Sequence, residues 1–191
     1  MALGSNADAM SGRKVRNWNA FAAIVASLIG LMALVVSGYT AYVQRQQVRA
    51  QVWPYLMVGY ADIEHARIVF NKGVGPALVR SVQVFVDGKP QPDWKHVMSA
   101  LGLSDKISYQ QSTLASNVLS ANEKLEIFVV GDEGDYKAFR GQSIGRASTR
   151  ICYCSTLEDC WMYDDHRQPD EPRTQPIDRC PELPSGQAFL Q

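Results

Sequence analysis

Four cysteines are the residues in this 191-residue chain whose types and spacing could most readily do chemistry. Cysteine thiols form disulfides, bind zinc as thiolates or act as redox dithiols. Cys152, Cys154 and Cys160 follow a C-x-C-x5-C spacing, which is neither a common zinc pattern nor a C-x-x-C redox pair, so we predict structural disulfides. A hairpin would bring Cys154 beside Cys160 and leave Cys152 for Cys180. Four cysteines allow three pairings, and spacing does not choose among them.

A second pattern, Gly141-Gln-Ser143-Ile-Gly145, matches the G-x-S-x-G signature of a serine nucleophile. That chemistry needs a strand before the serine and a helix after it. Here a helix-like stretch, 132–140, comes first and a strand follows. His166 follows two aspartates on one strand, where neighbouring side chains point to opposite faces. We therefore expect no catalytic residue and no enzyme, and we keep an envelope hydrolase using Ser143 as an alternative.

Histidines and acidic residues give little sign of a metal site. His65, His96 and His166 stand apart, without H-x-x-x-H or H-E-x-x-H spacing. The acids around His166 are more typical of a solvated surface than of a weak divalent-cation site; they are Asp164, Asp165, Asp170 and Glu171. Neither a nucleotide fingerprint nor a basic-aromatic surface occurs, so we expect no cofactor, no metal and no nucleic-acid partner.

An uncharged segment precedes the region that carries these residues. No charged residue occurs from Asn17 to Gln44, and residues 20–43 are mostly apolar. A helix of that length spans roughly 36 Å, enough for a hydrocarbon core of about 30 Å. We predict a transmembrane helix at 20–43, with a helical stalk at 44–52 that ends before Pro54. The apolar stretch is long for a cleaved signal peptide, so we expect an uncleaved signal anchor.

Charge and cysteine distribution predict the orientation of this span. The chain has 19 basic and 19 acidic residues, yet residues 1–52 contain five basic residues and one acid. Three of these basic residues precede the span and two follow it, which favours a cytoplasmic segment at 1–19. The cysteines all lie on the other side, as in an oxidising compartment. The composition excludes a multi-span membrane protein and a strongly basic nucleic-acid binder.

Small side chains recur on one face of the predicted span. Such a stripe lets two helices approach closely, although alanine and glycine are common in these helices by chance. Besides the lipid bilayer, we therefore hypothesise a homodimer or another membrane or envelope protein as partner. The stripe consists of Ala22, Ala26, Gly30, Ala33, Ser37 and Ala41.

Residues 53–167 favour a β-rich exported domain. Val82, Val84 and Val86 alternate with other residues in the pattern of a half-buried strand, and Asp87-Gly88 is a tight-turn dipeptide. Helical character is confined to 92–103 and 132–140. We expect mainly β structure, an immunoglobulin-like antiparallel sandwich, with an α+β domain as the alternative. The proline-rich tail at 168–191 reads as irregular, tied by Cys180. The expected strands are 55–60, 66–71, 77–86, 116–119, 124–130, 145–155 and 160–164.

The segment Asn71-Lys-Gly73-Val-Gly75-Pro76-Ala77 is expected to be a strand-linking turn. Its glycines allow positive φ or close backbone approach, and Pro76 fixes the start of the next strand. A phosphate-binding loop would lead into a helix instead.

Five segments follow one another along the chain: the predicted span, Val52-Trp53-Pro54-Tyr55, the N-x-G-x-G-P-A segment, Ile151-Cys-Tyr-Cys-Ser155 and Cys160-Trp161. Together they resemble a set of uncharacterised single-pass bacterial envelope proteins. The resemblance implies an anchored exported domain and no known activity, so it assigns no functional residues. From the span, its flanking charges and the cysteines we expect a bacterial inner-membrane protein with a periplasmic C-terminal domain. We expect a role in binding or scaffolding at the envelope, with a weak metal-binding or thiol protein as a further alternative.

Overall fold

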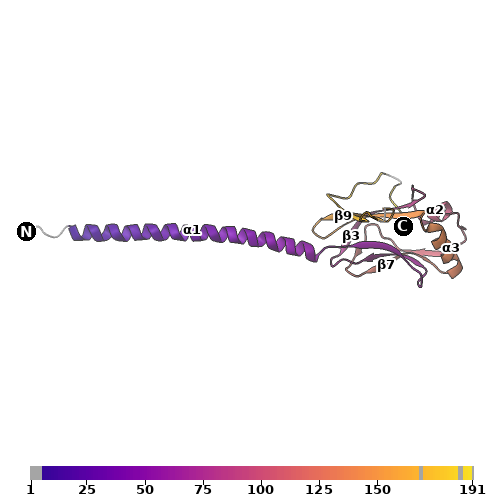
Figure 1. Cartoon of the computed structure of the whole chain (residues 1–191), viewed down its shortest axis with the longest axis horizontal. Helices are drawn as coiled ribbons and strands as arrows, with labels where there is room; N and C mark the ends of the chain where they lie inside the picture. Colours follow the sequence, from indigo (N-terminus) through magenta and orange to yellow (C-terminus); the bar gives the residue numbers. More distant parts are fainter. Residues whose placement is uncertain (1–5, 168–169, 185–186, 191) are drawn as a thin grey trace, which may run out of the picture. The chain divides into compact units, whose positions relative to one another are not determined.

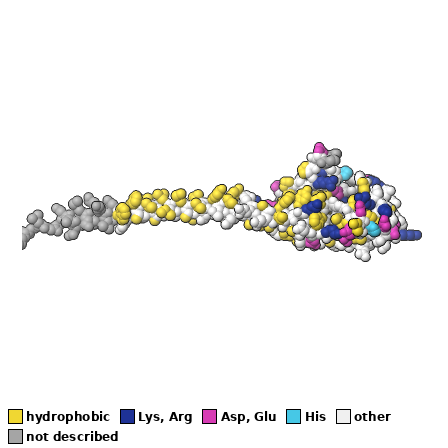
Figure 2. Space-filling model, turned by 60° about the horizontal axis from the view of Figure 1, so that its bottom comes forward, with side chains coloured by type: hydrophobic (Ala, Val, Ile, Leu, Met, Phe, Trp, Pro, Cys, Tyr) yellow, Lys and Arg dark blue, Asp and Glu magenta, His cyan; other side chains and the backbone are white. Residues whose placement is uncertain are grey.

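The computed structural model describes residues 6–167, 170–184 and 187–190, with side chains from Trp18 onward. It divides into two compact units, Met1–Val48 and Arg49–Gln191. Helix α1, Asn6–Gln51, supplies nearly all of the first unit. Within the described residues it is the one helix long and apolar enough to cross a membrane. Its large apolar side chains are exposed, as a helix surrounded by lipid requires (Figure 2).

The long helix ends where the sequence indicates, because Pro54 disfavours helical backbone at Trp53. The helix already begins at Asn6, so it contains both the predicted span at 20–43 and nearly all of the predicted stalk at 44–52.

The second unit contains two antiparallel sheets that pack face to face (Figure 1). The four-stranded sheet has the order β1-β2-β7-β5, with β1 Leu56–Ala61, β2 Ala66–Asn71, β7 Lys124–Val130 and β5 Tyr109–Gln111. The six-stranded sheet has the order β10-β9-β8-β3-β4, with β6 paired to β3. Its strands are β10 Thr174–Ile177, β9 Cys160–Asp164, β8 Ala147–Cys154, β3 Ala77–Val86, β4 Lys89–Gln91 and β6 Val118–Leu119.

The core lies between these sheets. The alternation along β3 buries Val82, Val84 and Val86, while Phe128 of β7 packs on Trp94 with ring centroids 4.5 Å apart. Four expected strands, β2, β3, β7 and β9, have the predicted bounds. The short strands β4, β5 and β10 were not expected, because three or four residues carry too little periodicity to read.

Two short helices, α2 Trp94–Ala100 and α3 Glu133–Ser143, lie together at one end of the sheets (Figure 1). The side chain of Asp132 caps α3, as expected, by accepting a 2.9 Å hydrogen bond from the Asp135 N–H. The predicted tight turn joins β3 to β4, with positive φ at both Asp87 and Gly88. A mainly β domain with two short helices is therefore confirmed.

The expectation of an irregular tail is wrong in part. β10 pairs with β9 and forms the outer edge of the six-stranded sheet. Pro176, which has no backbone N–H, is tolerated there because an edge strand has no further strand to donate to on its outer side. Further on, the N–H of Phe189 donates to the Val82 carbonyl at 2.9 Å, and the Phe189 ring is 2% exposed. The described part of the tail thus belongs to the sandwich.

Candidate functional site

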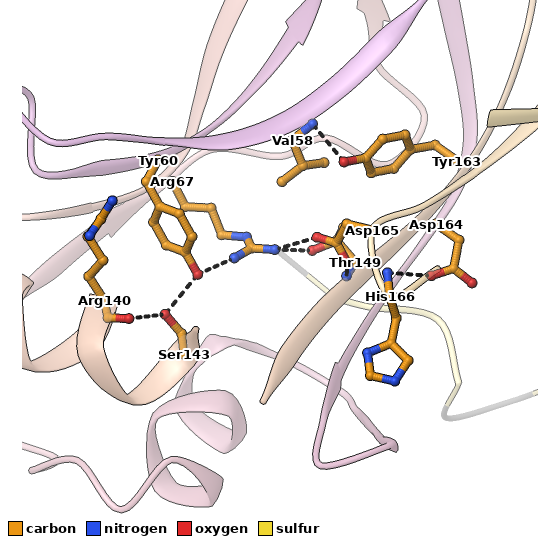
Figure 3. Close-up of polar contacts among 10 residues, drawn as sticks. All are labelled: Val58, Tyr60, Arg67, Arg140, Ser143, Thr149, Tyr163, Asp164, Asp165 and His166. Atoms are coloured by element: carbon orange, nitrogen blue, oxygen red, sulfur yellow. Dashed lines mark hydrogen bonds and ion pairs between the residues drawn. The ribbon is translucent and has the colours of Figure 1, made fainter. Parts of the chain in front are cut away.

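A polar cluster centred on Arg67 joins the two sheets (Figure 3). Arg67 lies on β2 and is only 3% exposed. Its Nη1 donates to the Tyr60 hydroxyl at 2.6 Å, and its Nη2 donates to Thr149 Oγ1 at 2.7 Å and Asp165 Oδ2 at 2.9 Å. Because Tyr60 is on β1 and Thr149 on β8, one guanidinium connects both layers. Sequence reasoning did not single out Arg67, since nothing local marks an arginine as buried.

The charge balance of this cluster is set by its burial. Desolvation raises the pKa of the Asp165 carboxyl, and the facing Arg67 guanidinium and the Thr149 N–H oppose that shift. Arg67 Nε is buried without a hydrogen-bond partner in the described structure. The cluster is therefore a cross-sheet link, in which the charged groups of Arg67 and Asp165 bind each other.

Two tyrosines close the free edge of β1. The hydroxyl of Tyr153 accepts a 3.4 Å hydrogen bond from the Leu56 N–H, and that of Tyr163 accepts a 3.3 Å bond from the Val58 N–H. Burial raises the pKa of Tyr153 to about 12 and also raises the pKa of Tyr163. Since unpaired edge groups invite strand addition, these hydroxyls protect β1.

Ser143 does not have the surroundings of a catalytic nucleophile. It is the last residue of α3 and is fully buried, with β8 following after a turn. Its Oγ lies 2.8 Å from the Tyr60 hydroxyl and donates to the Arg140 carbonyl at 3.1 Å (Figure 3). None of these partners is a base, and the elbow geometry of strand, serine and helix is absent from this described segment.

The histidines serve separate local contacts. His65 stacks on Tyr136 with ring centroids 5.2 Å apart, and His96 Nδ1 lies 2.8 Å from Asp93 Oδ1. His166 is exposed, and its N–H donates to Asp164, which also pairs with Arg150 at 2.8 Å. In the described part of the chain, none of the predicted acids joins a group of three metal-ligating side chains.

All four cysteines form disulfides, which was the expected chemistry. The bonds are Cys152–Cys180 and Cys154–Cys160, the hairpin pairing considered from the sequence. Cys154 and Cys160 are directly opposite each other in β8 and β9, while Cys180 fixes the tail to the middle of the sheet. A disulfide sulfur carries no thiolate charge, so these residues do not fit a zinc site in this form.

The Asn71 side chain holds the N-x-G-x-G-P-A segment in place by binding its backbone. Its fully buried side chain accepts from the N–H groups of Tyr55 (3.1 Å) and Gly73 (2.9 Å) and donates to the Gly75 carbonyl at 2.8 Å. A Cβ at Gly73 or Gly75 would collide with the backbone of residues 52–55. The expected strand-linking turn is thus confirmed, and its glycines serve close approach, because both lie outside the positive-φ region. β3 begins directly after Pro76.

Two cavities among the described residues of the second unit are large enough for a small molecule. One of about 630 Å³ lies between the tail and β3, and its lining includes Arg80, Val82, Phe189 and three of the cysteines. The other, of about 560 Å³, lies beside α2 and is lined by residues such as Met98, Leu103 and Tyr109. Both volumes fall in the range of small-molecule sites, roughly 300–1,000 Å³.

Comparison with protein-family models, with curated proteins and with solved structures found no match for the chain.

Proposed function

We propose that the chain is a single-pass bacterial inner-membrane protein whose periplasmic domain binds or scaffolds an envelope protein. The observation that carries this proposal is the joining of an apolar, exposed helix to a disulfide-bonded β-sandwich. Disulfides persist in oxidising compartments, which supports a periplasmic domain and a cytoplasmic N-terminus. The resemblance to uncharacterised single-pass envelope proteins is part of the same proposal.

Strand order supports an immunoglobulin-like type of sandwich. In that fold, strands A, B, E and D form one sheet, and C, F and G form the other. The order β1-β2-β7-β5 corresponds to A-B-E-D, and β3-β8-β9 corresponds to C-F-G. One departure is that both disulfides start from β8 and stay on its own sheet and tail, instead of joining the two sheets.

We place the partner contact at the turn between β1 and β2. Ile63 in that turn is 94% exposed. Asp62 beside it accepts a 2.7 Å hydrogen bond from the Tyr136 hydroxyl and pairs with Arg140 at 2.7 Å, and His65 stacks on Tyr136. The turn is thus held on α3 while its apolar side chain faces outward. Such preorganisation lowers the entropic cost of binding a partner.

Site-specific photo-crosslinking in native membranes tests this placement. A photoreactive residue at position 63 is expected to give a discrete crosslinked product that Asp62→Ala weakens, because that change releases the turn from α3. Val118, which is 51% exposed on β6, is the matched control position. Equal products from both positions, or none from position 63, would contradict the placement.

Orientation requires a separate measurement. Protease added to spheroplasts is expected to degrade the 49–191 unit, and a tag placed before α1 is expected to stay protected until the membrane is permeabilised. Protection of the 49–191 unit would overturn the proposed orientation.

A further inference from the structure

The two disulfides touch each other through one sulfur of each. Cys154 Sγ lies 3.8 Å from Cys180 Sγ, close to van der Waals contact. The sulfurs of Cys154, Cys160 and Cys180 all lie within 4.8 Å of one another. Cys152, although bonded to Cys180, is not a member of that group. A thiolate on Cys154 would therefore have a second disulfide directly beside it.

The cavity of about 630 Å³ gives access to this group, because Cys154, Cys160 and Cys180 are part of its lining. A smaller cavity, of about 330 Å³, also reaches Cys160. The larger cavity has an apolar part that includes Val82 and Phe189. Its lining carries charges of both signs, from Arg80, Arg179, Glu158, Asp178 and Glu182. The Arg80 side chain is exposed and forms no hydrogen bond or ion pair with any described residue. A small zwitterionic thiol, such as cysteine or a short cysteine peptide, is small enough to enter this cavity, and its two charges have opposite charges to pair with in the lining.

We propose that the cavity is a thiol–disulfide exchange site for a small zwitterionic thiol. The incoming thiolate attacks Cys160 Sγ, forms a mixed disulfide there and releases the Cys154 thiolate. Cys154 then attacks Cys180 Sγ, forms the Cys154–Cys180 bond and releases the Cys152 thiolate, which takes up a proton. Each step makes one S–S bond and breaks one, so the only co-reactant is the thiol.

The exchange would move the attachment of the tail by two residues along β8, from Cys152 to Cys154. The freed Cys152 is 1% exposed and lies away from solvent thiols. It would therefore remain a protected thiol after the exchange, since reactivity needs an accessible thiolate. This proposal does not depend on the membrane orientation or on the partner proposed above.

Three-cysteine variants of the full chain test the internal step. Cys160→Ser leaves Cys154 without its partner, and alkylation followed by peptide mapping is expected to find the free thiol at both Cys154 and Cys152, together with a Cys154–Cys180 bridge. Cys180→Ser is the matched control, in which the free thiol is expected to stay at Cys152 because that sulfur lies outside the three-sulfur group. A thiol confined to Cys154 in the first variant, or scrambled in both, would overturn the proposal.

The unmodified chain provides a measurement that needs no variant to fold. Full-length protein in detergent is incubated with cysteine at mildly alkaline pH, quenched with acid, alkylated and mapped. The expected products are cysteinylated Cys160, a Cys154–Cys180 bridge and alkylated Cys152. An adduct on Cys180 with Cys154–Cys160 intact would contradict the assigned order of attack, and the absence of any Cys154–Cys180 bridge would remove the exchange site.

Discussion

Asp165 Oδ2 lies 2.9 Å from Nη2 of Arg67, and this pair joins a residue just after β9 to the second residue of β2 in the opposite sheet. The two side chains are 15% and 4% exposed. A buried pair costs desolvation energy to form, yet removing one partner leaves the other charge uncompensated.

We therefore expect Arg67→Met to lower the free energy of unfolding by about 3–5 kcal/mol. Arg150→Met is the matched control, because Arg150 is 43% exposed where it pairs with Asp164, and its loss should cost less than about 1 kcal/mol. Guanidinium unfolding of the full chain in detergent, followed by tryptophan fluorescence, measures both. Similar losses from the two variants would contradict the role given to Arg67.

The raised pKa of Tyr153 leads us to expect that the folded domain loses stability at alkaline pH. Burial raises its folded-state pKa from 10.0 to about 12, so between these values the unfolded chain loses this proton and the folded chain keeps it. Stability should therefore fall by about 1.4 kcal/mol for each pH unit in that window. The slope should be shallower in Tyr153→Phe, which removes the titrating group. Unfolding curves at several pH values measure the difference, and parallel slopes would exclude this contribution.

Gly75→Ala should destabilise the turn that follows β2. The added methyl group would meet the Val52 carbonyl, and overpacking of this kind costs about 1–3 kcal/mol. Gly59→Ala is the control, because a Cβ there meets nothing within 4 Å. Chemical denaturation compares the two variants. An unchanged denaturation midpoint for Gly75→Ala would show that the backbone of residues 52–55 does not lie against Gly75.

The two disulfides should differ in their stabilising effect. Cys152–Cys180 spans 28 residues and Cys154–Cys160 spans 6, so loop entropy predicts contributions of about 3.5 and about 2 kcal/mol. The double variants Cys152→Ser/Cys180→Ser and Cys154→Ser/Cys160→Ser, melted side by side, check this order. The opposite order would mean that the tail gains little from its covalent attachment.

Gly30→Leu tests the small-residue stripe of α1. A bulky side chain would keep two helices apart, so we expect loss of the dimer crosslink in membranes. Gly38→Leu is the control, since Gly38 lies outside the stripe and neither glycine has a neighbour within 4 Å in the single chain. If the unmodified chain and both variants all give only a monomer band, the proposed dimer is excluded.

Much of the fold could be predicted because its signals are local. The apolar segment, the period-two strands, the Asp132 cap and the Asp87-Gly88 turn depend on residues a few positions apart. β10 and the docking of Phe189 could not be read in this way. Their stability comes from pairing: β10 needs the preceding strand β9 to be already in place in the sheet, and Phe189 binds β3, which is distant along the chain.

The features of the candidate site likewise fall into those that the sequence predicts and those that need the tertiary structure. By itself, the sequence determined that Ser143 lacks a nucleophile elbow and that the four cysteines suit disulfides, because both follow from spacing along one chain. Only the tertiary structure decided that Arg67 is buried against Asp165, that tyrosine hydroxyls close the β1 edge, and that Cys154 of one disulfide touches Cys180 of the other. Those relations join residues 26 to 105 positions apart, and a physical contact at that separation exists only once the two sheets and the tail have packed.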